Sequence, residues 1–288
     1  MKAAQFEYLR PASLRETLQQ LAQAEGQAKL LAGSQSLGPM LNLRLARPAR
    51  LLDVSGLNEM RTVSLVQGSL RVGASITHAE LEDGRFEALR GHPVQEVAAR
   101  IAYRSVRNRG TVGGSLAHAD PAADWVLAAY ALNAEVEVSS VETIDARMNP
   151  VTRMIAMCDF MQAAYTTALK PTELITAVHI PQFTAQARWG YYKFCRKTGE
   201  FAEASCAAYF EPATQTAQIV VGALDGVPAV LGALALRVAQ TGLSAATDQA
   251  VEEALLESVT QLDVLGRRMA GAAVKRCLAQ AFEQRVQA

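Results

Sequence analysis

The tightest constraint on the fold is a glycine-rich stretch in the middle of the chain, residues 109–125, which reads RGTVGGSLAHADPAADW. Glycine has no side chain to hold a ligand away, so Gly113 and Gly114 would let the main chain touch a bound molecule directly. Asp120 and Asp124 follow, and their carboxylates could accept hydrogen bonds from the hydroxyl groups of a sugar. Asp124 could alternatively cap the helix expected after it. The segment up to Asp120 is therefore predicted to be irregular and to contact a ligand.

A second loop of small residues lies nearer the N-terminus, where residues 30–37 read LLAGSQSL. Such a loop can direct several main-chain N–H groups at one point, and a phosphate or pyrophosphate bound there would gain about 1.5–3 kcal/mol per charged hydrogen bond. The alternative is an ordinary turn that ends a strand. A Walker loop is excluded because Pro39 occupies the position of its lysine, and the lack of a GxGxxG motif disfavours a Rossmann fold.

Four arginines precede the glycine-rich stretch. Arg100, Arg104 and Arg107 share one face of a predicted helix, and Arg109 lies just beyond it. The simplest interpretation is a basic face exposed to solvent. The alternative is a patch that docks an acidic partner or guides an electron acceptor that carries phosphate.

Hydrophobic periodicity and breaker residues predict a chain of mixed helices and strands. The predicted helices are 14–24, 93–103, 124–132, 229–240, 248–259 and 263–286. The predicted strands are 28–32, 51–54, 62–66, 69–74, 134–138, 173–180, 189–194, 205–211 and 217–224, of which 62–66 and 69–74 form a hairpin. In the C-terminal part, strands come first and helices afterwards, as in an α+β module, so we place a domain boundary near residues 171–181.

Charge and composition exclude several classes of function. Lys and Arg total 28, and Asp and Glu total 28, so no overall field attracts nucleic acid. No apolar run reaches the roughly 18–20 residues that span a bilayer, and residues 1–11 lack the hydrophobic region of a signal peptide, so we expect a cytoplasmic protein. Histidine and cysteine spacing predicts no metal of the chain's own, and predicts reduced packing cysteines at Cys158, Cys195, Cys206 and Cys277.

At both loops and in one further segment the sequence resembles the FAD-binding medium subunit of the xanthine oxidase family of molybdenum hydroxylases, of the carbon monoxide dehydrogenase flavoprotein type. The resemblance rests on AGSQSLGPMLNLRL at 32–45, TVGGSLAHADPAAD at 111–124 and YYKFCRKTGEFAEASCA at 191–207. Three segments in this order are far more specific than any single one.

The resemblance implies an α+β fold of the vanillyl-alcohol-oxidase or PCMH type. Two α/β subdomains, residues 1–56 and 57–176, would bind FAD between them. A C-terminal α+β domain of antiparallel sheet and helices, residues 177–288, would lie against the flavin.

The resemblance also implies which residues bind the cofactor. The first loop would wrap the pyrophosphate of a non-covalently bound FAD through Leu30, Leu31, Ala32, Gly33, Ser34, Gln35, Ser36 and Leu37. The second would lie beside a phosphate and the flavin through Thr111, Val112, Gly113, Gly114 and Ser115. Asp124 would bind the ribityl hydroxyls, while Ile101 and Ile175 would pack on the cofactor. Asp120 belongs to the expected set, although relatives often carry a small polar residue there.

Two residues are expected to act on the flavin itself. The resemblance places Lys193 near the isoalloxazine ring, where its charge would favour the reduced flavin, or where it would only anchor a phosphate or a neighbouring loop. Phe201 would shield one face of the ring, or would simply belong to the core. Ser34 and Glu200 replace a glycine and an aspartate that are frequent in the family, and neither change removes a donor or a charge.

The resemblance implies an oxidoreductase subunit that performs one stage of an electron relay. A large subunit would carry molybdopterin and oxidise the substrate, and a small subunit would carry two 2Fe–2S clusters. FAD on this chain would pass electrons to NAD, a quinone or another acceptor, in an assembly expected to be a dimer of heterotrimers. Carbon monoxide, aldehydes, aromatic acids, purines and other N-heterocycles stay open as substrates. The alternatives are a self-contained flavin oxidase or dehydrogenase, and a non-catalytic nucleotide-binding assembly subunit.

Overall fold

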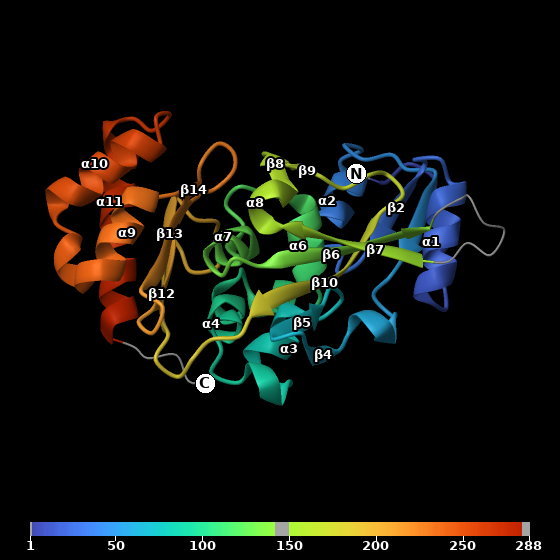
Figure 1. The fold of residues 1–288 in the computed structure, drawn as a ribbon. Coiled ribbons are helices and arrows are strands. Elements are labelled where there is room, and N and C mark those ends of the chain that lie inside the picture. The colour runs from blue at the N-terminus through green and yellow to red at the C-terminus, as the bar shows by residue number, and fades with distance from the viewer. Residues whose placement is uncertain (1, 142–149, 284–288) are drawn as a thin grey trace.

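The computed structural model describes residues 2–141 and 150–283. Three main sheets lie in a row, from the N-terminal part at one end to the C-terminal helices at the other (Figure 1). This arrangement confirms the predicted α+β class. No helix within the described ranges is long and apolar enough to cross a membrane.

The N-terminal part is a small parallel sheet with strand order β1-β3-β2. Its elements are β1 (Glu7–Leu9), α1 (Leu14–Gln23), β2 (Ala28–Leu31), α2 (Leu37–Asn42) and β3 (Arg50–Asp53). Helix α1 begins after Ser13, whose hydroxyl accepts a hydrogen bond from the Glu16 N–H, and it buries Leu18 and Leu21. Because the strands are parallel, their carboxyl ends meet at one edge, and the loop after β2 starts from that edge.

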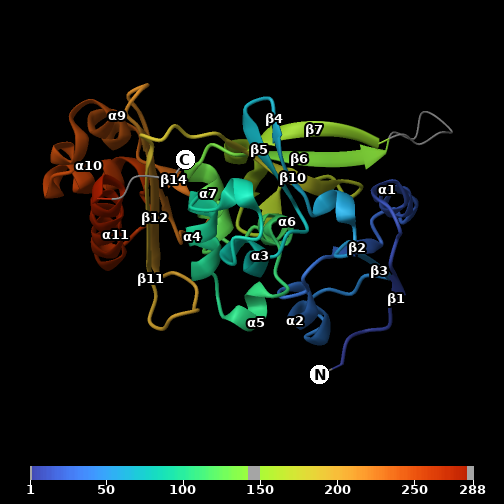
Figure 2. The ribbon, with the colours of Figure 1, turned by 90° about the horizontal axis from the view of Figure 1, so that it is seen from below.

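The middle part is an antiparallel sheet with strand order β4-β5-β10-β6-β7, and Figure 2 shows its helices gathered on one face. The strands are β4 (Val63–Val66), β5 (Ser69–Gly73), β6 (Glu135–Val141), β7 (Pro150–Ala156) and β10 (Leu174–Pro181). The helices are α3 (His78–Glu82), α4 (Pro93–Arg100), α5 (Arg104–Arg107), α6 (Val112–His118), α7 (Asp124–Ala131) and α8 (Met157–Phe160), with short turns η1 (Asn58–Met60) and η2 (Glu87–Leu89). A small separate hairpin joins β8 (Met161–Ala163) to β9 (Thr166–Thr167).

The C-terminal part is an antiparallel sheet with strand order β11-β12-β13-β14 and helices packed against it. Its elements are β11 (Arg188–Phe194), β12 (Ala204–Glu211), β13 (Thr216–Gly222), β14 (Ala229–Val230), α9 (Gly232–Thr241), η3 (Gly242–Ala245), α10 (Asp248–Ser258) and α11 (Val264–Glu283). Helix α11 approaches β11 so closely that a Cβ on Gly190 would lie 2.0 Å from the Cys277 carbonyl oxygen. Only glycine allows this packing.

Helix α7 joins the middle and C-terminal parts. Its sequence DWVLAAYA is apolar on all sides after the first residue, as expected for a helix enclosed by the protein. Every residue of α7 is buried, and the helix packs on α4 and α6 on one side and on β12 and β13 on the other. Its first residue, Asp124, is consequently only 6% exposed.

Strand β10 passes through the boundary expected between residues 176 and 177. It pairs with β5 as far as Pro181 opposite Ser69, so it completes the middle sheet. We infer that the C-terminal domain begins after Pro181.

The structure also corrects three local predictions. Residues 112–118 form helix α6 where an irregular segment was predicted, because the Thr111 hydroxyl caps the helix and its glycines allow close packing. Helix α9 begins at Gly232, after the short strand β14, rather than at residue 229. The predicted last helix ends at Val286, which lies outside the described residues. All four cysteines are free as predicted, but Cys158 is exposed and does not pack in the core.

Candidate functional site

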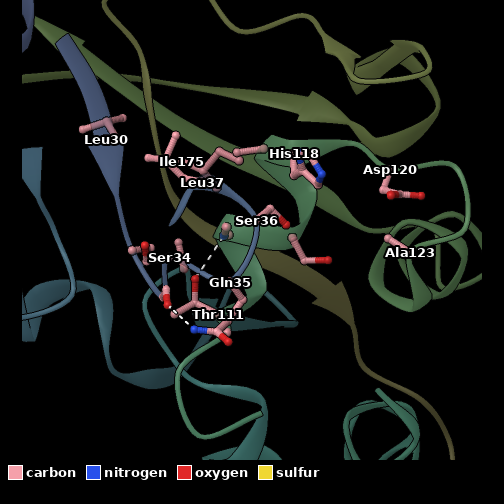
Figure 3. Close-up of a pocket in the computed structure, with 18 of the residues that line it drawn as sticks. Leu30, Ser34, Gln35, Ser36, Leu37, Thr111, His118, Asp120, Ala123 and Ile175 are labelled. Atoms are coloured by element: carbon pink, nitrogen blue, oxygen red, sulfur yellow. Dashed lines mark hydrogen bonds between the residues drawn. The ribbon is translucent and has the colours of Figure 1, made fainter. Parts of the chain in front are cut away.

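A cleft of about 740 Å³ lies where the three parts of the chain meet. Its lining combines the loop after β2, helix α6, the β8–β9 hairpin and the loop after β11. Figure 3 shows the loop after β2 passing beside α6, so that two stretches far apart in the sequence form one wall. The cleft is therefore a product of tertiary packing.

The loop after β2 offers free main-chain donors. Among the residues that the structure describes, no group accepts a hydrogen bond from the main-chain N–H of residues 33–37. The Gln35 side chain donates to the Gly33 carbonyl oxygen at 2.8 Å and so steadies the loop (Figure 3). Ser34 has a φ of 62°, in the left-handed region that favours glycine. A row of unpaired N–H groups beside a cleft is suited to a phosphate or another anion.

The second wall is the start of helix α6. The Thr111 hydroxyl accepts from the Gly114 N–H at 3.1 Å, and the Gly113 N–H donates to the Ala74 carbonyl at 2.9 Å. A Cβ on Gly113 would lie 2.5 Å from the Cβ of Ala74. The glycines thus let α6 lie against the end of β5, which fixes the helix at the rim of the cleft.

The two loops touch at Gly33. A Cβ on this residue would lie 2.0 Å from the Arg109 carbonyl oxygen and 2.8 Å from the Cα of Gly110. These atoms belong to the main chain and cannot rotate away. Glycine at position 33 is therefore required for the first loop to meet the second.

A buried polar cluster also lines the cleft. The Asp124 carboxylate accepts hydrogen bonds from the Tyr191 hydroxyl and from Lys193 Nζ, which is 3.1 Å from both carboxylate oxygens. The Asp124 and Lys193 side chains are 5% and 6% exposed. Burial raises the pKa of Asp124, although the Lys193 ammonium and both hydrogen bonds act in the opposite direction. The alternative that Asp124 caps the next helix is wrong. Asp124 is the first residue of α7, and the N-cap position is occupied by Ala123, where no side chain accepts a hydrogen bond from the helix.

A buried histidine also lines the cleft. The Trp125 indole donates to Nδ1 of His78 at 3.0 Å, which leaves the proton of the neutral imidazole on Nε2. Burial, with a smaller contribution from Arg107, lowers the pKa of His78 to about 3. His78 is therefore neutral at physiological pH.

The β8–β9 hairpin forms a rim that the sequence did not predict. Its Tyr165 N–H donates to the Ala119 carbonyl at 2.8 Å, and the Tyr165 ring lies 5.2 Å from the His118 ring. The Tyr165 hydroxyl donates to Asp120 at 3.3 Å. No local sequence pattern marks this hairpin, because its position depends on contacts with the end of α6.

Most of the predicted site residues line this cleft. They are Leu30, Ala32, Gly33, Ser34, Gln35, Ser36, Leu37, Ile101, Thr111, Gly113, Gly114, Ser115, Asp120, Asp124, Ile175, Lys193 and Phe201. Leu31 and Val112 are not among the lining residues, and the Val112 side chain is in the core, so any ligand contact from them would come from the main chain. Phe201 is 62% exposed, which rules out the alternative that it belongs to the core.

The basic face expected from the arginine spacing does not form. The helix breaks after Arg100, and the side chains pair with acids instead. Arg100 binds Glu96, while Arg104 and Arg107 both bind Glu82 at 2.8 Å. Arg104 and Arg107 therefore connect α5 to α3, whereas the ion pair of Arg100 lies within α4.

Comparison with known proteins gives a consistent result. Residues 4–183 match the family model described as the FAD binding domain in molybdopterin dehydrogenase. The chain is 36% identical over 215 residues to the nicotine 6-hydroxylase medium subunit of Paenarthrobacter nicotinovorans, covering 74% of this chain and 71% of that one. It is 33% identical over 223 residues to the carbon monoxide dehydrogenase medium chain of Hydrogenophaga pseudoflava, covering 77% and 75%.

Solved structures agree over nearly the whole length. The quinoline 2-oxidoreductase of Pseudomonas putida 86 superposes with a TM-score of 0.86 at 30% identity, covering 98% of this chain and 99% of that one. The carbon monoxide dehydrogenase of Hydrogenophaga pseudoflava superposes with a TM-score of 0.83 at 28% identity, with the same coverage.

Proposed function

This chain belongs to the family of FAD binding domains in molybdopterin dehydrogenases, and from that premise we propose that it is the FAD-carrying electron-transfer subunit of a heterotrimeric molybdenum hydroxylase. FAD is its cofactor, and the chain is a subunit of an oxidoreductase. One observation carries the finer proposal. The main-chain donors of residues 33–37, unpaired within the described part of the chain, line a cleft and are held against the second loop at Gly33.

The residues of this loop fit the pyrophosphate of FAD. Five consecutive N–H groups, which have no acceptor among residues 2–141 and 150–283, can donate to an anion, and the small side chains of the loop leave room for it to approach. Backbone donors need no reorganisation once the loop is fixed by Gly33 and Gln35. We assign pyrophosphate binding to residues 33–37, with Thr111 and Ser115 on the facing wall.

Other residues that line the cleft fit the flavin and its ribityl chain. Ile101 and Ile175 supply apolar contact, and Phe201 is exposed at the cleft, where it can cover a ring. Asp124 already accepts hydrogen bonds from Tyr191 and Lys193, so a ribityl hydroxyl would share a carboxylate that is held in place. Lys193 is kept beside the cleft by the same carboxylate.

Bound FAD supplies two-electron redox chemistry, while the protein supplies binding, orientation and the local charge. By analogy with the named relatives, we assign substrate oxidation to a large molybdopterin subunit and electron delivery to the 2Fe–2S clusters of a small subunit. The acceptor would be NAD, a quinone or another oxidant, and the complex a dimer of heterotrimers. The relatives act on nicotine, carbon monoxide and quinoline by their names, which keeps small N-heterocycles among the candidate substrates.

Titration of the flavin-free chain with FAD, FMN and riboflavin tests the assignment. FMN lacks the pyrophosphate and riboflavin lacks any phosphate, so each lost set of charged hydrogen bonds should weaken binding by about tenfold or more. The expected order of affinity is FAD, then FMN, then riboflavin. A folded chain that stays colourless with FAD, or that binds all three equally, would refute the pyrophosphate assignment.

Two further measurements separate the alternatives. Acid precipitation of the loaded protein should leave the flavin in the supernatant, whereas a self-contained oxidase with a covalent tether would retain it in the pellet. Anaerobic reduction with dithionite, followed by mixing with NAD or a quinone, should reoxidise the flavin. A flavin that no acceptor reoxidises would support the non-catalytic assembly subunit.

A further inference from the structure

Two histidines of this chain are buried and neutral, but only one of them lines the cleft. His78 is 4% exposed and lies at the start of α3. Its Nδ1 is occupied by the Trp125 indole N–H, so its remaining proton is on Nε2. Among the described residues, no group accepts a hydrogen bond from that Nε2.

His78 lines the cleft, and its Nε2 lies beside the second loop. A Cβ on Gly110 would lie 2.8 Å from Nε2, so a side chain at this position would block the imidazole edge that glycine leaves free of one. The main chain also ties His78 to the second loop, because its N–H donates to the Gly110 carbonyl at 3.0 Å. The ring is thus fixed on one side by Trp125 and on the other by the loop that carries Thr111.

We propose that His78 is a cofactor-binding residue whose Nε2–H donates a hydrogen bond to FAD in the cleft, an inference that rests on the proposed function. FAD carries oxygen and nitrogen acceptors along its whole length, and a buried donor without a partner is costly until an acceptor reaches it. Trp125 acts as a positioning residue, because its N–H selects the tautomer that presents the donor.

His92 shows what a purely structural histidine looks like in the same chain. Its Nδ1 accepts from the Val94 N–H at 3.3 Å, and its ring stacks on Phe183 at 5.1 Å. Its Nε2 is buried and has no partner among the residues that the structure describes, and His92 is not among the residues that line the cleft. His92 therefore provides an internal control for the loss of a buried imidazole.

The test compares His78→Asn with His78→Gln. Asparagine can keep the acceptor for the Trp125 N–H but has no donor at the Nε2 position, whereas glutamine can place its amide nitrogen there. FAD titration of the flavin-free proteins should show binding about tenfold weaker for His78→Asn and within about twofold of wild type for His78→Gln. The visible spectrum of bound FAD should shift in His78→Asn only.

Thermal unfolding of the flavin-free proteins separates binding from stability. His92→Leu should lower the melting temperature without changing the affinity for FAD. His78→Asn that binds FAD as tightly as wild type, with an unchanged spectrum, would overturn the inference while leaving the proposed function intact. A folded wild-type chain that binds no FAD would overturn both.

Discussion

The cleft is lined by main-chain N–H groups on one element and by a buried ion pair on others. The N–H groups belong to residues 33–37, which we call the main-chain cradle and which meet the second loop at Gly33. The ion pair joins Asp124 of α7 to Lys193 of β11, and Tyr191 of β11 also donates to Asp124. A ligand that fills the cleft would meet both a neutral cradle and a buried ion pair.

This difference separates two ways of making a binding site. The main-chain cradle tolerates a change of side chain as long as the backbone can keep its conformation. Substitutions should therefore weaken binding mainly at positions where an added Cβ would clash. The ion pair tolerates no loss of either partner, because a single charge would be left in a buried site. Substitutions in the cradle and in the ion pair should therefore fail for different reasons.

The largest effect is expected from Lys193→Met, which leaves the Asp124 carboxylate buried without its cation. Breaking a buried ion pair typically costs about 3–5 kcal/mol, and urea unfolding of the flavin-free chain would measure the loss. The matched control is Lys275→Met, whose partner Asp248 is exposed, and this variant should lose about 1 kcal/mol or less. Equal losses in the two variants would contradict the distinct character of the Asp124 pair.

The same variant should also become sensitive to pH. Without Lys193 the pKa of Asp124 rises further above its ordinary value of 3.8, because burial is no longer opposed by the ammonium. Between the unfolded and the raised folded pKa the native state binds more protons, so stability falls as pH rises through that window. Unfolding of Lys193→Met should therefore be easier at about pH 8 than at about pH 5. Identical wild-type and variant profiles would contradict this.

A smaller effect is expected from Gly33→Ala at the cradle. The added Cβ would meet the Arg109 carbonyl, so the loops must separate at a cost of about 1–3 kcal/mol, and FAD affinity should fall about tenfold or more. Gly226→Ala is the control, since its Cβ would meet nothing within 4 Å. Unchanged FAD affinity in Gly33→Ala would show that the contact between the loops is dispensable.

The smallest effect, and the only gain, is expected from Ser34→Gly. Ser34 adopts a φ of 62°, which costs a residue with a Cβ about 1–2 kcal/mol. Glycine would remove this strain, but its greater conformational entropy in the unfolded chain would offset part of the gain in stability. The net gain should be about 0.5–1 kcal/mol in unfolding experiments, with FAD affinity preserved. Ser36→Gly, at a φ of −105°, should instead lose about 0.5–1 kcal/mol. A loss of affinity in Ser34→Gly would give the hydroxyl a role that the cradle does not require.

Much of this site was predictable because main-chain chemistry leaves a local trace. Gly33, Gly113 and Gly114 indicate a main chain in close contact with a neighbouring group. The structure shows that their neighbours within the protein are Arg109, Ala74 and Thr111, respectively. The strands and helices followed from hydrophobic period in the same way. Helix α6 was missed because its glycines read as breakers, whereas packing against β5 and the Thr111 cap outweigh their low helix propensity.

Neighbouring residues in the chain are enough to predict the fold class, most of the longer helices and strands, and the two loops of small residues, because each of these depends on local pattern. Folding in three dimensions is what pairs Lys193 with Asp124, places the Trp125 indole on Nδ1 of His78 and brings the Tyr165 hydroxyl to Asp120. Each of these contacts joins residues more than forty positions apart, and burial sets its strength. No local pattern encodes the distance or the solvent exclusion on which such contacts depend.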